Sequence, residues 1–423
     1  MKTQSFVHTD LGPGKDVNTD SYLEDAELRV FAVADGLGDY SSAEVASALA
    51  TRLLREYLTE HRAILDQFAQ DGNDRVRVLK ALEDSTRKAG YAIYRKAQED
   101  LSRRGMGTTL SVLLLTPSRG FLAHVGDSRI YILRRGESVQ LTQDHSLVSD
   151  MIRNGRLKKG DPQLQAYRDE VTRALGIYAD VQVDTRDFEL AAGDTFLLCT
   201  DGLADTLGDR REINDVIDTH GLKAAPRAFI NLARARGADD NVTALILRVT
   251  AERGELSAPD ARDISDKLDV LKRMPLFQHL SYVELVEVLN VSDVRGFSAG
   301  EKIFSEGQVG DAVYVVLDGL VSIRRGGIEL IRMGSGGHFG EMAIMDKGPR
   351  SAEAVAEQDS RLIEVGRRSL FTLMRKEKDI AVKLLWCFVQ VLNQRLRATN
   401  EDLLKARGHL DAAAPLPDLD TFE

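Results

Sequence analysis

The sequence VFAVADGLG, residues 30–38, decides the fold of the first half of the chain. An apolar run of this length before Asp-Gly predicts a strand, from Leu28 to Ala34, that ends in Asp35-Gly36. Asp201 and Asp240 also stand beside apolar runs. Because Asp-Gly is ordinary turn chemistry, each aspartate by itself predicts no more than a turn.

Helical and strand patterns surround this first strand. Helical spacing covers residues 43–61 and about 75–103, and short apolar runs at 108–115, 119–125 and 129–134 predict consecutive strands. Helix blocks beside hairpin-like strands favour an α+β layered domain over a doubly wound one. The first helix should bury one stripe of residues: Val45, Leu49, Leu53, Leu54 and Leu58.

The second half of the chain has a different pattern. Short apolar strands separated by glycines run from Phe297 to Val365, which predicts an antiparallel β-roll, and helical spacing follows from about residue 367 to 406. The polar stretch AERGELSAPDARD reads as a linker. The predicted division is a first domain at 1–250, a linker at 251–263, a second domain at 264–407 and a flexible tail at 408–423.

Composition excludes several classes of protein. The net charge of −10 argues against a general affinity for nucleic acid or for an anionic membrane surface. The apolar runs are of strand length and the N-terminus lacks the pattern of a signal peptide. Two cysteines, Cys199 and Cys387, make neither a disulfide framework nor a zinc site. We expect a soluble protein of the reducing cytoplasm, with no nucleic-acid or membrane partner.

The aspartates at the strand ends suggest a cation site. Several carboxylates at the mouth of one core are unfavourable unless cations or partners neutralise them. Because no cysteine or histidine pattern accompanies them, an all-oxygen site favours Mg²⁺ or Mn²⁺ over zinc.

Eight segments resemble, in order, the PPM/PP2C phosphatases and in particular their bacterial members. The resemblance covers Asp10 to Val249. Its segments are KDVNTDS (15–21), VADGLG (33–38), GTT (107–109), HVGDSRIY (124–131), LTQDHSLV (141–148), TRALG (172–176), CTDGL (199–203) and DNVT (240–243). The fold implied is a β-sandwich flanked by helices on both sides.

The resemblance also implies an activity and its site. The activity would be hydrolysis of phosphoserine or phosphothreonine by a metal-activated water, in proteins that a serine/threonine kinase phosphorylates. The implied ligands of two or three metal ions are Asp20, Asp35, the Gly36 carbonyl, Asp127 for a third and weaker ion, Asp201 and Asp240. Asp35 and Asp201 would be catalytic together with Lys15. Residues 146–172 would form a flap beside the cleft.

Three positions depart from the family pattern. Lys15 stands where the family usually places an arginine that holds the substrate phosphate, and lysine lacks the forked geometry. Thr19 replaces an acidic or amide residue, and Asp39-Tyr40 replaces a glycine-histidine pair. These departures motivate a second hypothesis, a pseudophosphatase that binds phosphoproteins without turnover.

An anion site is predicted in the second domain. In HFGEMAIM (338–345) and GPRSA (348–352), glycines can expose backbone N–H groups, and Arg350 can close over an anion. The region from about Leu276 to Arg407 resembles cyclic-nucleotide-binding domains. Arg350 would bind the cyclic phosphate of cyclic AMP or cyclic GMP and Glu341 the ribose. The implied set is Gly340, Glu341, Met342, Ala343, Arg350 and Ser351, whereas Glu353 would oppose an anion.

The last helix carries a broad apolar stripe that fits packing against the roll better than a coiled-coil seam. Its members are Ile380, Leu384, Leu385, Phe388, Val391, Leu392 and Leu396. A homodimer through this helix is the remaining partner prediction. A third hypothesis is that the roll has lost its ligand and serves only in docking or dimerisation.

Overall fold

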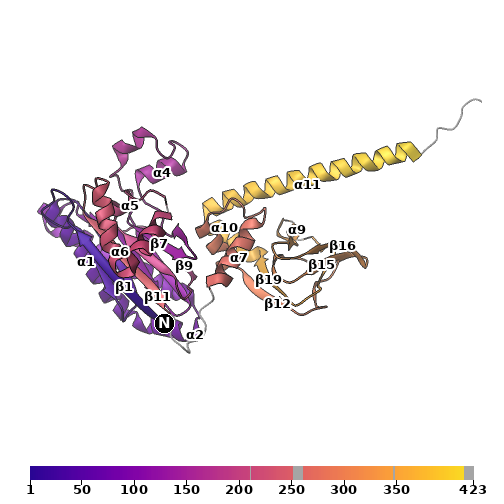
Figure 1. Ribbon diagram of the computed structural model, residues 1–423, viewed down its shortest axis with the longest axis horizontal. Coiled ribbons are helices and arrows are strands. Elements are labelled where there is room, and N and C mark those ends of the chain that lie inside the picture. The colour runs from indigo at the N-terminus through magenta and orange to yellow at the C-terminus, as the bar shows by residue number, and fades with distance from the viewer. Residues whose placement is uncertain (210, 251–260, 346–347, 414–423) are drawn as a thin grey trace, which may run out of the picture. The chain divides into compact units, whose positions relative to one another are not determined.

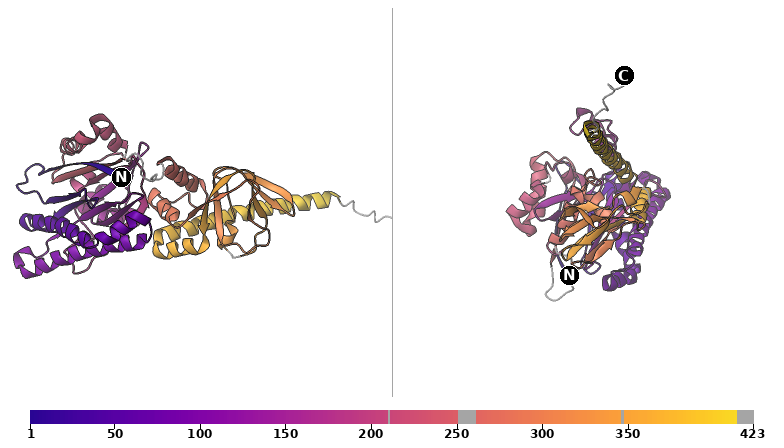
Figure 2. Two further views of the ribbon diagram at one scale, coloured as in Figure 1. Left: turned by 90° about the horizontal axis from the view of Figure 1, so that it is seen from below. Right: turned by 90° about the vertical axis from the view of Figure 1, so that its right-hand side faces the viewer.

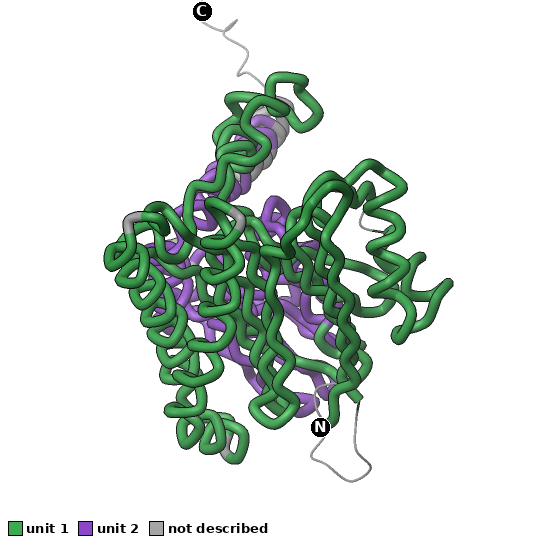
Figure 3. The backbone as a smooth tube through the Cα atoms, turned by 90° about the vertical axis from the view of Figure 1, so that its left-hand side faces the viewer, with its two compact units in different colours: residues 1–264 green, residues 265–423 purple. Residues whose placement is uncertain are grey.

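The computed structural model describes residues 1–209, 211–250, 261–345 and 348–413. The chain divides into two compact units, Met1–Ile264 and Ser265–Glu423 (Figure 3). Most of the predicted linker, residues 251–260, lies outside the described residues. Its last three residues are not linker but open helix α7 (Ala261–Arg273), where Asp263 in the first turn suits the positive end of the helix dipole.

Two antiparallel sheets form the centre of the first unit (Figure 1). One has the order β1-β11-β10-β7-β8, and the other has the order β2-β3-β5-β6-β9 with β4 paired to β3. The strands are β1 (Lys2–Asp10), β2 (Asp20–Asp25), β3 (Val30–Leu37), β4 (Gly107–Thr108), β5 (Leu110–Leu115), β6 (Arg119–Val125), β7 (Arg129–Arg134), β8 (Glu137–Gln140), β9 (Asp184–Glu189), β10 (Thr195–Cys199) and β11 (Val242–Thr250).

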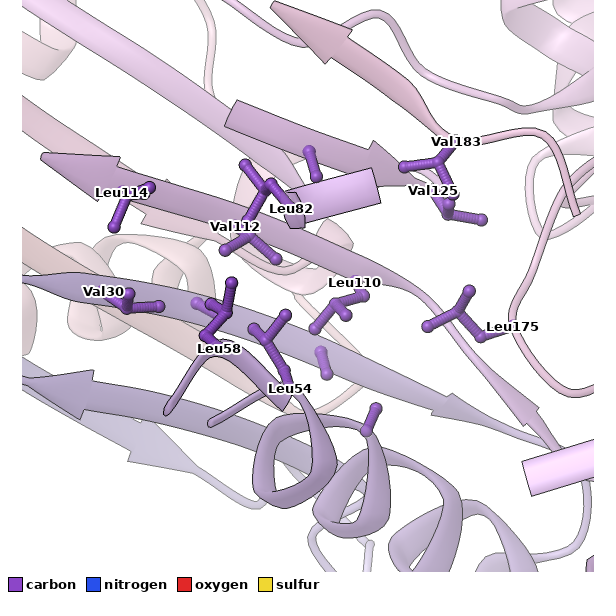
Figure 4. Packing of buried hydrophobic residues seen from close by; sticks show 14 of the residues in the cluster. Val30, Leu54, Leu58, Leu82, Leu110, Val112, Leu114, Val125, Leu175 and Val183 are labelled. Atoms are coloured by element: carbon purple, nitrogen blue, oxygen red, sulfur yellow. The ribbon is translucent and has the colours of Figure 1, made fainter. Parts of the chain in front are cut away.

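Helices cover the outer face of each sheet (Figure 2). The helices α1 (Tyr40–Glu60), α2 (Arg62–Asp71) and α3 (Arg75–Glu99) share a core with the β3 sheet (Figure 4). The helices α5 (Asp201–Ala204) and α6 (Arg211–Ala235) share one with β10 and β11. The shorter elements are α4 (Leu147–Arg153) and the 3-10 helices η1 (Leu101–Arg103) and η2 (Pro162–Tyr167). The predicted sandwich flanked by helices is confirmed.

Strand β3 is longer than the sequence predicted. Its apolar residues are fully buried because helices cover one face and the second sheet covers the other. The strand does not end at Asp35 but continues to Leu37. Asp35 pairs with Asp20 across β2, and Gly36 pairs with Thr108 across β4, so ladder hydrogen bonds extend the strand through the Asp-Gly pair.

The buried stripe of α1 also differs from the prediction. Leu54 and Leu58 are buried, but Val45, Leu49 and Leu53 are only partly buried. Smaller residues, among them Ala46 and Ala50, face the sheet instead. Small side chains let the helix backbone approach the sheet closely, which a count of large apolar residues does not reveal.

The second unit contains two four-stranded antiparallel sheets, as predicted for a β-roll. Their orders are β12-β19-β14-β17 and β13-β18-β15-β16. The strands are β12 (Asp293–Phe297), β13 (Lys302–Phe304), β14 (Ala312–Asp318), β15 (Val321–Arg325), β16 (Ile328–Met333), β17 (His338–Phe339), β18 (Glu353–Ala356) and β19 (Ser360–Gly366). The remaining helices are α8 (Tyr282–Asn290), α9 (Met342–Met345), α10 (Arg367–Lys376) and α11 (Lys378–Ala413).

The C-terminal helix corrects the predicted tail. Helix α11 runs through residues 408–413 rather than ending at 407, because Leu410, Ala412 and Ala413 are good helix formers that offset Gly408. Residues 414–423 lie outside the described part of the chain. Among the described residues, none of the helices combines the length and apolarity that a membrane span requires.

Candidate functional site

Strand ends from both sheets of the first unit bring carboxyl groups together. Asp20 and Asp35 lie opposite each other on β2 and β3. Asp201 opens α5 directly after β10, and its charge is among the causes that raise the pKa values of Asp35 and Asp20. Asp240 lies two residues before β11, and its charge acts on all three. Carboxyl groups that repel one another at a site shielded from water require protons or a cation to neutralise them.

Burial and mutual repulsion raise the pKa values of this cluster. Burial is the largest cause, and it raises the pKa of Asp20 to about 7 and the pKa of Asp201 to about 6. The pKa of Asp35 is raised well above its usual value, first by burial and then by the charges of Asp201 and Asp20. The site therefore concentrates negative charge that only protons or cations can neutralise.

Asp127 faces the same cluster from the turn after β6. It is buried, and burial followed by the charge of Asp201 raises its pKa. The turn is fixed by His145, whose backbone N–H donates to the Gly126 carbonyl at 2.8 Å. The His145 Nδ1 atom accepts from the Gly126 N–H at 3.1 Å.

Two hydroxyl groups hold Asp20 in place, and the sequence interpretation missed both. Thr200 Oγ1 and Thr243 Oγ1 donate to Asp20 Oδ2 at 2.8 and 2.7 Å. These hydrogen bonds oppose the effect of burial on the pKa of Asp20. Their signal was available, because both threonines lie inside the quoted segments CTDGL and DNVT.

Lys15 contacts a carboxylate rather than an open phosphate site. Its Nζ atom lies 2.8 Å from Asp240 Oδ1. Asn241 positions the loop that carries Lys15, because its Oδ1 accepts from both the N–H and the hydroxyl of Thr19, at 2.8 and 2.7 Å. Thr19 is therefore a buried loop anchor, and the ammonium group already supplies one positive charge to the cluster.

The donor set fits divalent ions that prefer oxygen. Among the described residues, no group of three or more acidic, histidine or cysteine side chains is arranged so that it could hold a metal ion. The carboxylates of the cluster are nevertheless the type of donor that Mg²⁺ and Mn²⁺ prefer, and the Lys15 ammonium group supplies one positive charge to them. Gly36 allows the close approach of α1, since a Cβ there would lie 2.2 Å from the Ala43 carbonyl oxygen. The charges of Asp201 and Asp240 raise the pKa values of both Asp20 and Asp35, and the charge of Asp201 also raises that of Asp127.

The first unit has a cavity of about 350 Å³, which none of the predicted metal ligands lines. Leu37, two residues after Asp35, lines it together with residues from the end of the predicted flap. The remaining lining residues are Asp169, Glu170, Val171, Thr172, Ala174, Ile177 and Tyr178. The end of the predicted flap thus forms part of this cavity wall, with the acidic residues Asp169 and Glu170 among the lining residues.

A second cavity, of about 300 Å³, lies in the β-roll. Gly340, Glu341, Met342, Arg350 and Ser351 line it, as predicted, and Ala343 lies in the adjoining helix α9. The Arg350 guanidinium donates to the carbonyls of Gly340 and Ala312, at 3.0 and 2.8 Å.

Arg350 is buried over an aromatic floor. Its guanidinium carbon lies 4.1 Å from the centre of the Phe304 ring. Burial lowers the pKa of Arg350. Within the residues that the structure describes, its Nε atom has no hydrogen-bond partner, so one buried donor remains for an anionic ligand. The predicted opposition from Glu353 is offset by Lys302, whose Nζ atom lies 2.7 Å away.

Two family models match the chain. Residues 14–242 match the protein phosphatase 2C family, and residues 294–377 match the cyclic nucleotide-binding domain. The serine/threonine phosphatase stp of Listeria welshimeri is 34% identical over 219 residues, which are 52% of this chain and 83% of that protein. The protein phosphatase PhpP of Streptococcus pneumoniae is 30% identical over 58% of this chain and 98% of that protein.

Solved structures resemble the first unit. The crystal structure of the Mycobacterium tuberculosis serine/threonine phosphatase PstP/Ppp has a TM-score of 0.52 and 30% identity, covering 59% of this chain and all of that one. The serine/threonine phosphatase Stp1 of Staphylococcus aureus has a TM-score of 0.52 and 25% identity, covering 59% of this chain and 96% of that one. The cluster of aspartates lies within the region matched to the phosphatase family.

Proposed function

The chain belongs to the protein phosphatase 2C family of metal-dependent serine/threonine phosphatases and carries a cyclic nucleotide-binding domain, and on that premise we propose how it works. It hydrolyses phosphoserine and phosphothreonine in protein substrates, with divalent Mn²⁺ or Mg²⁺ held by Asp20, Asp35, Asp201 and Asp240. The observation that carries this proposal is the convergence of Asp20, Asp35 and Asp201 from β2, β3 and the end of β10, where burial and neighbouring carboxylates raise their pKa values.

The residues of the chain have separate tasks in this reaction. When bound, the ions lower the pKa of water and offset the charge on the phosphoryl oxygens. Asp35 and Asp201 would hold them, and Gly36 and Asp127 are further candidate ligands. Thr200 and Thr243 fix the orientation of Asp20 through their hydrogen bonds to its carboxylate.

The test is turnover of a phosphothreonine peptide with Mn²⁺ and with a chelator. Wild-type protein should release phosphate only with the metal, and Asp201→Asn should abolish release. Asp209→Asn is the matched control, because that aspartate is exposed in the loop after α5. Absence of metal-dependent release from the wild-type protein would overturn the proposal.

One contact favours a second candidate, a phosphoprotein-binding module without turnover. Lys15 lies on Asp240 and so competes with a cation for a proposed ligand. Lys15→Arg distinguishes the two, because a forked guanidinium holds phosphate better. An enzyme should show a lower KM for the peptide, whereas a binding module should show tighter binding of the phosphopeptide and no phosphate release.

We also propose that a cyclic nucleotide binds the roll cavity and regulates turnover. The buried Arg350, with a free donor over Phe304, would hold the cyclic phosphate, and Glu341 and Ser351 line the same cavity. Regulation requires a different affinity in the active and inactive states, typically about 1–3 kcal/mol. Phosphatase assays with and without cyclic AMP or cyclic GMP test this, and an unchanged rate and melting temperature with both nucleotides would contradict it.

A further inference from the structure

The predicted flap is anchored on two sides of the aspartate cluster. Just before it begins, the backbone N–H of His145 donates, at 2.8 Å, to a carbonyl of the turn that carries Asp127. Near its end, Arg168 Nη2 lies 3.0 Å from the carboxylate of Asp239, the residue before Asp240. The flap therefore leaves the first unit beside one proposed metal ligand and returns beside another.

The tip of the flap, which follows helix α4, is strongly basic. The run RNGRLKK, residues 153–159, contains four cations and no acidic residue. Arg153 pairs with Asp150, which lies one turn earlier in α4. The other three cations are exposed, and they have no acidic partner among the residues that the structure describes. We call them the tip cations: Arg156, Lys158 and Lys159.

The charge of the tip is opposite to that of the rest of the chain. The net charge is −10, and the aspartate cluster concentrates negative charge at the proposed site. A phosphoryl group on a protein itself carries about two negative charges, so this site repels its substrate until cations are bound. Exposed and unpaired positive charge attracts an acidic partner and orients it as the two molecules meet. The tip cations therefore fit an acidic segment of the protein substrate.

The length of α4 sets how far the tip reaches (Figure 1). The helix has 7 residues, which span about 10 Å. An extended peptide covers about 3.3 Å per residue, so about three residues bridge the same distance. We propose that the tip cations bind acidic side chains about three residues from the phosphorylated residue, and that the chain thereby prefers acidic phosphoproteins. This inference rests on the proposed phosphatase function and adds the class of substrate to it.

Binding of two phosphothreonine peptides tests the preference without turnover. The peptides carry a non-hydrolysable phosphonate in place of the phosphate, and they differ only at the third residue on either side, which is glutamate in one and lysine in the other. Calorimetry of the wild-type protein with Mn²⁺ should show that the glutamate peptide binds about fivefold more tightly, and added salt should reduce this difference because the charges are exposed. Equal binding of the two peptides, or binding of neither, would overturn the inference.

Turnover separates this inference from the function on which it rests. If the wild-type protein releases phosphate from an ordinary phosphothreonine peptide but binds both phosphonate peptides equally, the phosphatase function stands and only the preference for acidic substrates fails. If it binds the glutamate peptide more tightly but releases no phosphate with Mn²⁺, the phosphatase function fails while the preference of the tip stands.

Charge reversal shows whether the tip cations cause the preference. The double variant Arg156→Glu/Lys158→Glu should bind the lysine peptide more tightly than the glutamate peptide. The matched control is Arg227→Glu/Lys223→Glu, which reverses one exposed arginine and one exposed lysine on α6 and should keep the wild-type preference. A preference for glutamate that survives in the tip variant, or that is lost equally in both variants, would contradict the inference. Equal binding of the two peptides, together with tip-dependent binding to phosphatidylserine vesicles, would assign the tip to a membrane surface instead.

Discussion

The aspartate cluster and the roll cavity both bury charge, but they differ in sign and in how that charge is held. In the cluster, Asp20, Asp35 and Asp201 repel one another, and Lys15 supplies one opposing charge at Asp240. In the roll, Arg350 is held by two backbone carbonyls and an aromatic ring. The cluster is thus destabilised by its own charges, whereas Arg350 is largely satisfied.

This difference indicates what each ligand must contribute. A cation at the cluster relieves repulsion and supplies the charge that the reaction needs. An anion in the roll cavity would contact the Arg350 guanidinium, which has a free Nε donor. This contact is enough to bind the anion, but it is not what folds the domain. Removing a carboxylate from the metal-free cluster should therefore raise the stability of the protein, whereas removing the Arg350 charge from the roll should lower it.

The largest expected effect is that of Asp35→Asn. Turnover with Mn²⁺ should fall by about a thousandfold or more, because a proposed metal ligand is lost. The melting temperature of the metal-free protein should rise, because asparagine replaces a carboxyl group whose ionised form is disfavoured by burial and by its neighbours. Parallel loss of turnover and of melting temperature would instead show that Asp35 is only structural.

The substitution Arg350→Ala tests the second site, the roll cavity. Calorimetry should show that affinity for the cyclic nucleotide falls by about a hundredfold, since a charged and partly buried contact is lost. The melting temperature should also fall, because Phe304 loses its cover. Arg325→Ala, an exposed arginine on β15, is the control and should leave affinity unchanged. Equal affinity of both variants would contradict the role of Arg350.

The substitution Gly340→Ala tests the space that the Arg350 guanidinium occupies beside Gly340. Gly340 has φ +81°, and a Cβ there would lie 2.5 Å from Arg350 Nη1. A methyl group should displace the guanidinium and lower nucleotide affinity by about tenfold. Gly334→Ala is the matched control, because a Cβ there lies 3.9 Å from its nearest neighbour, the Gly319 carbonyl oxygen. A similar loss of nucleotide affinity in both variants would mean that the space beside Gly340 has no specific role in placing Arg350.

The smallest expected effect is the pH dependence of stability, which separates the acidic cluster from the roll cavity. The folded cluster holds protons that the unfolded chain releases, because its pKa values of about 7 for Asp20 and about 6 for Asp201 exceed the ordinary 3.8. The melting temperature of the metal-free protein should therefore fall as the pH rises from about 4 to about 7. Asp20→Asn should flatten this slope, and saturating Mn²⁺ should reverse it. A metal-free protein that gains stability over this range would contradict the raised pKa values.

Local sequence patterns predicted the elements well and their packing less well. Apolar runs located β3, β10 and β11, and glycine spacing located the roll, because both signals depend on short stretches of chain. The predicted end of β3 was wrong, because the last residues of the strand pair with β4, which comes from a distant segment of the chain. The buried face of α1 was also misjudged, since Ala46 and Ala50 carry little apolar weight in sequence.

For the candidate site, too, the sequence predicted which residues take part but not which contacts they make. The resemblance supplied the aspartates and Arg350, and the structure couples those aspartates electrostatically. It could not supply the contact between Lys15 and Asp240, which are far apart in the chain and meet only after β1 and β11 pair. Likewise, the sequence could not show that Leu385 and Leu392 of α11 are exposed, because this depends on which face of the helix its own unit buries.

Calorimetric titration of the metal-free protein with Mn²⁺ tests the central claim most directly. The wild-type protein should bind about two equivalents and release protons, because carboxyl groups with raised pKa values must ionise to hold the metal. Asp201→Asn should bind at least about tenfold more weakly and release fewer protons. Binding without proton release, or equal binding by the wild-type protein and the variant, would contradict the claim that these aspartates form a cation site.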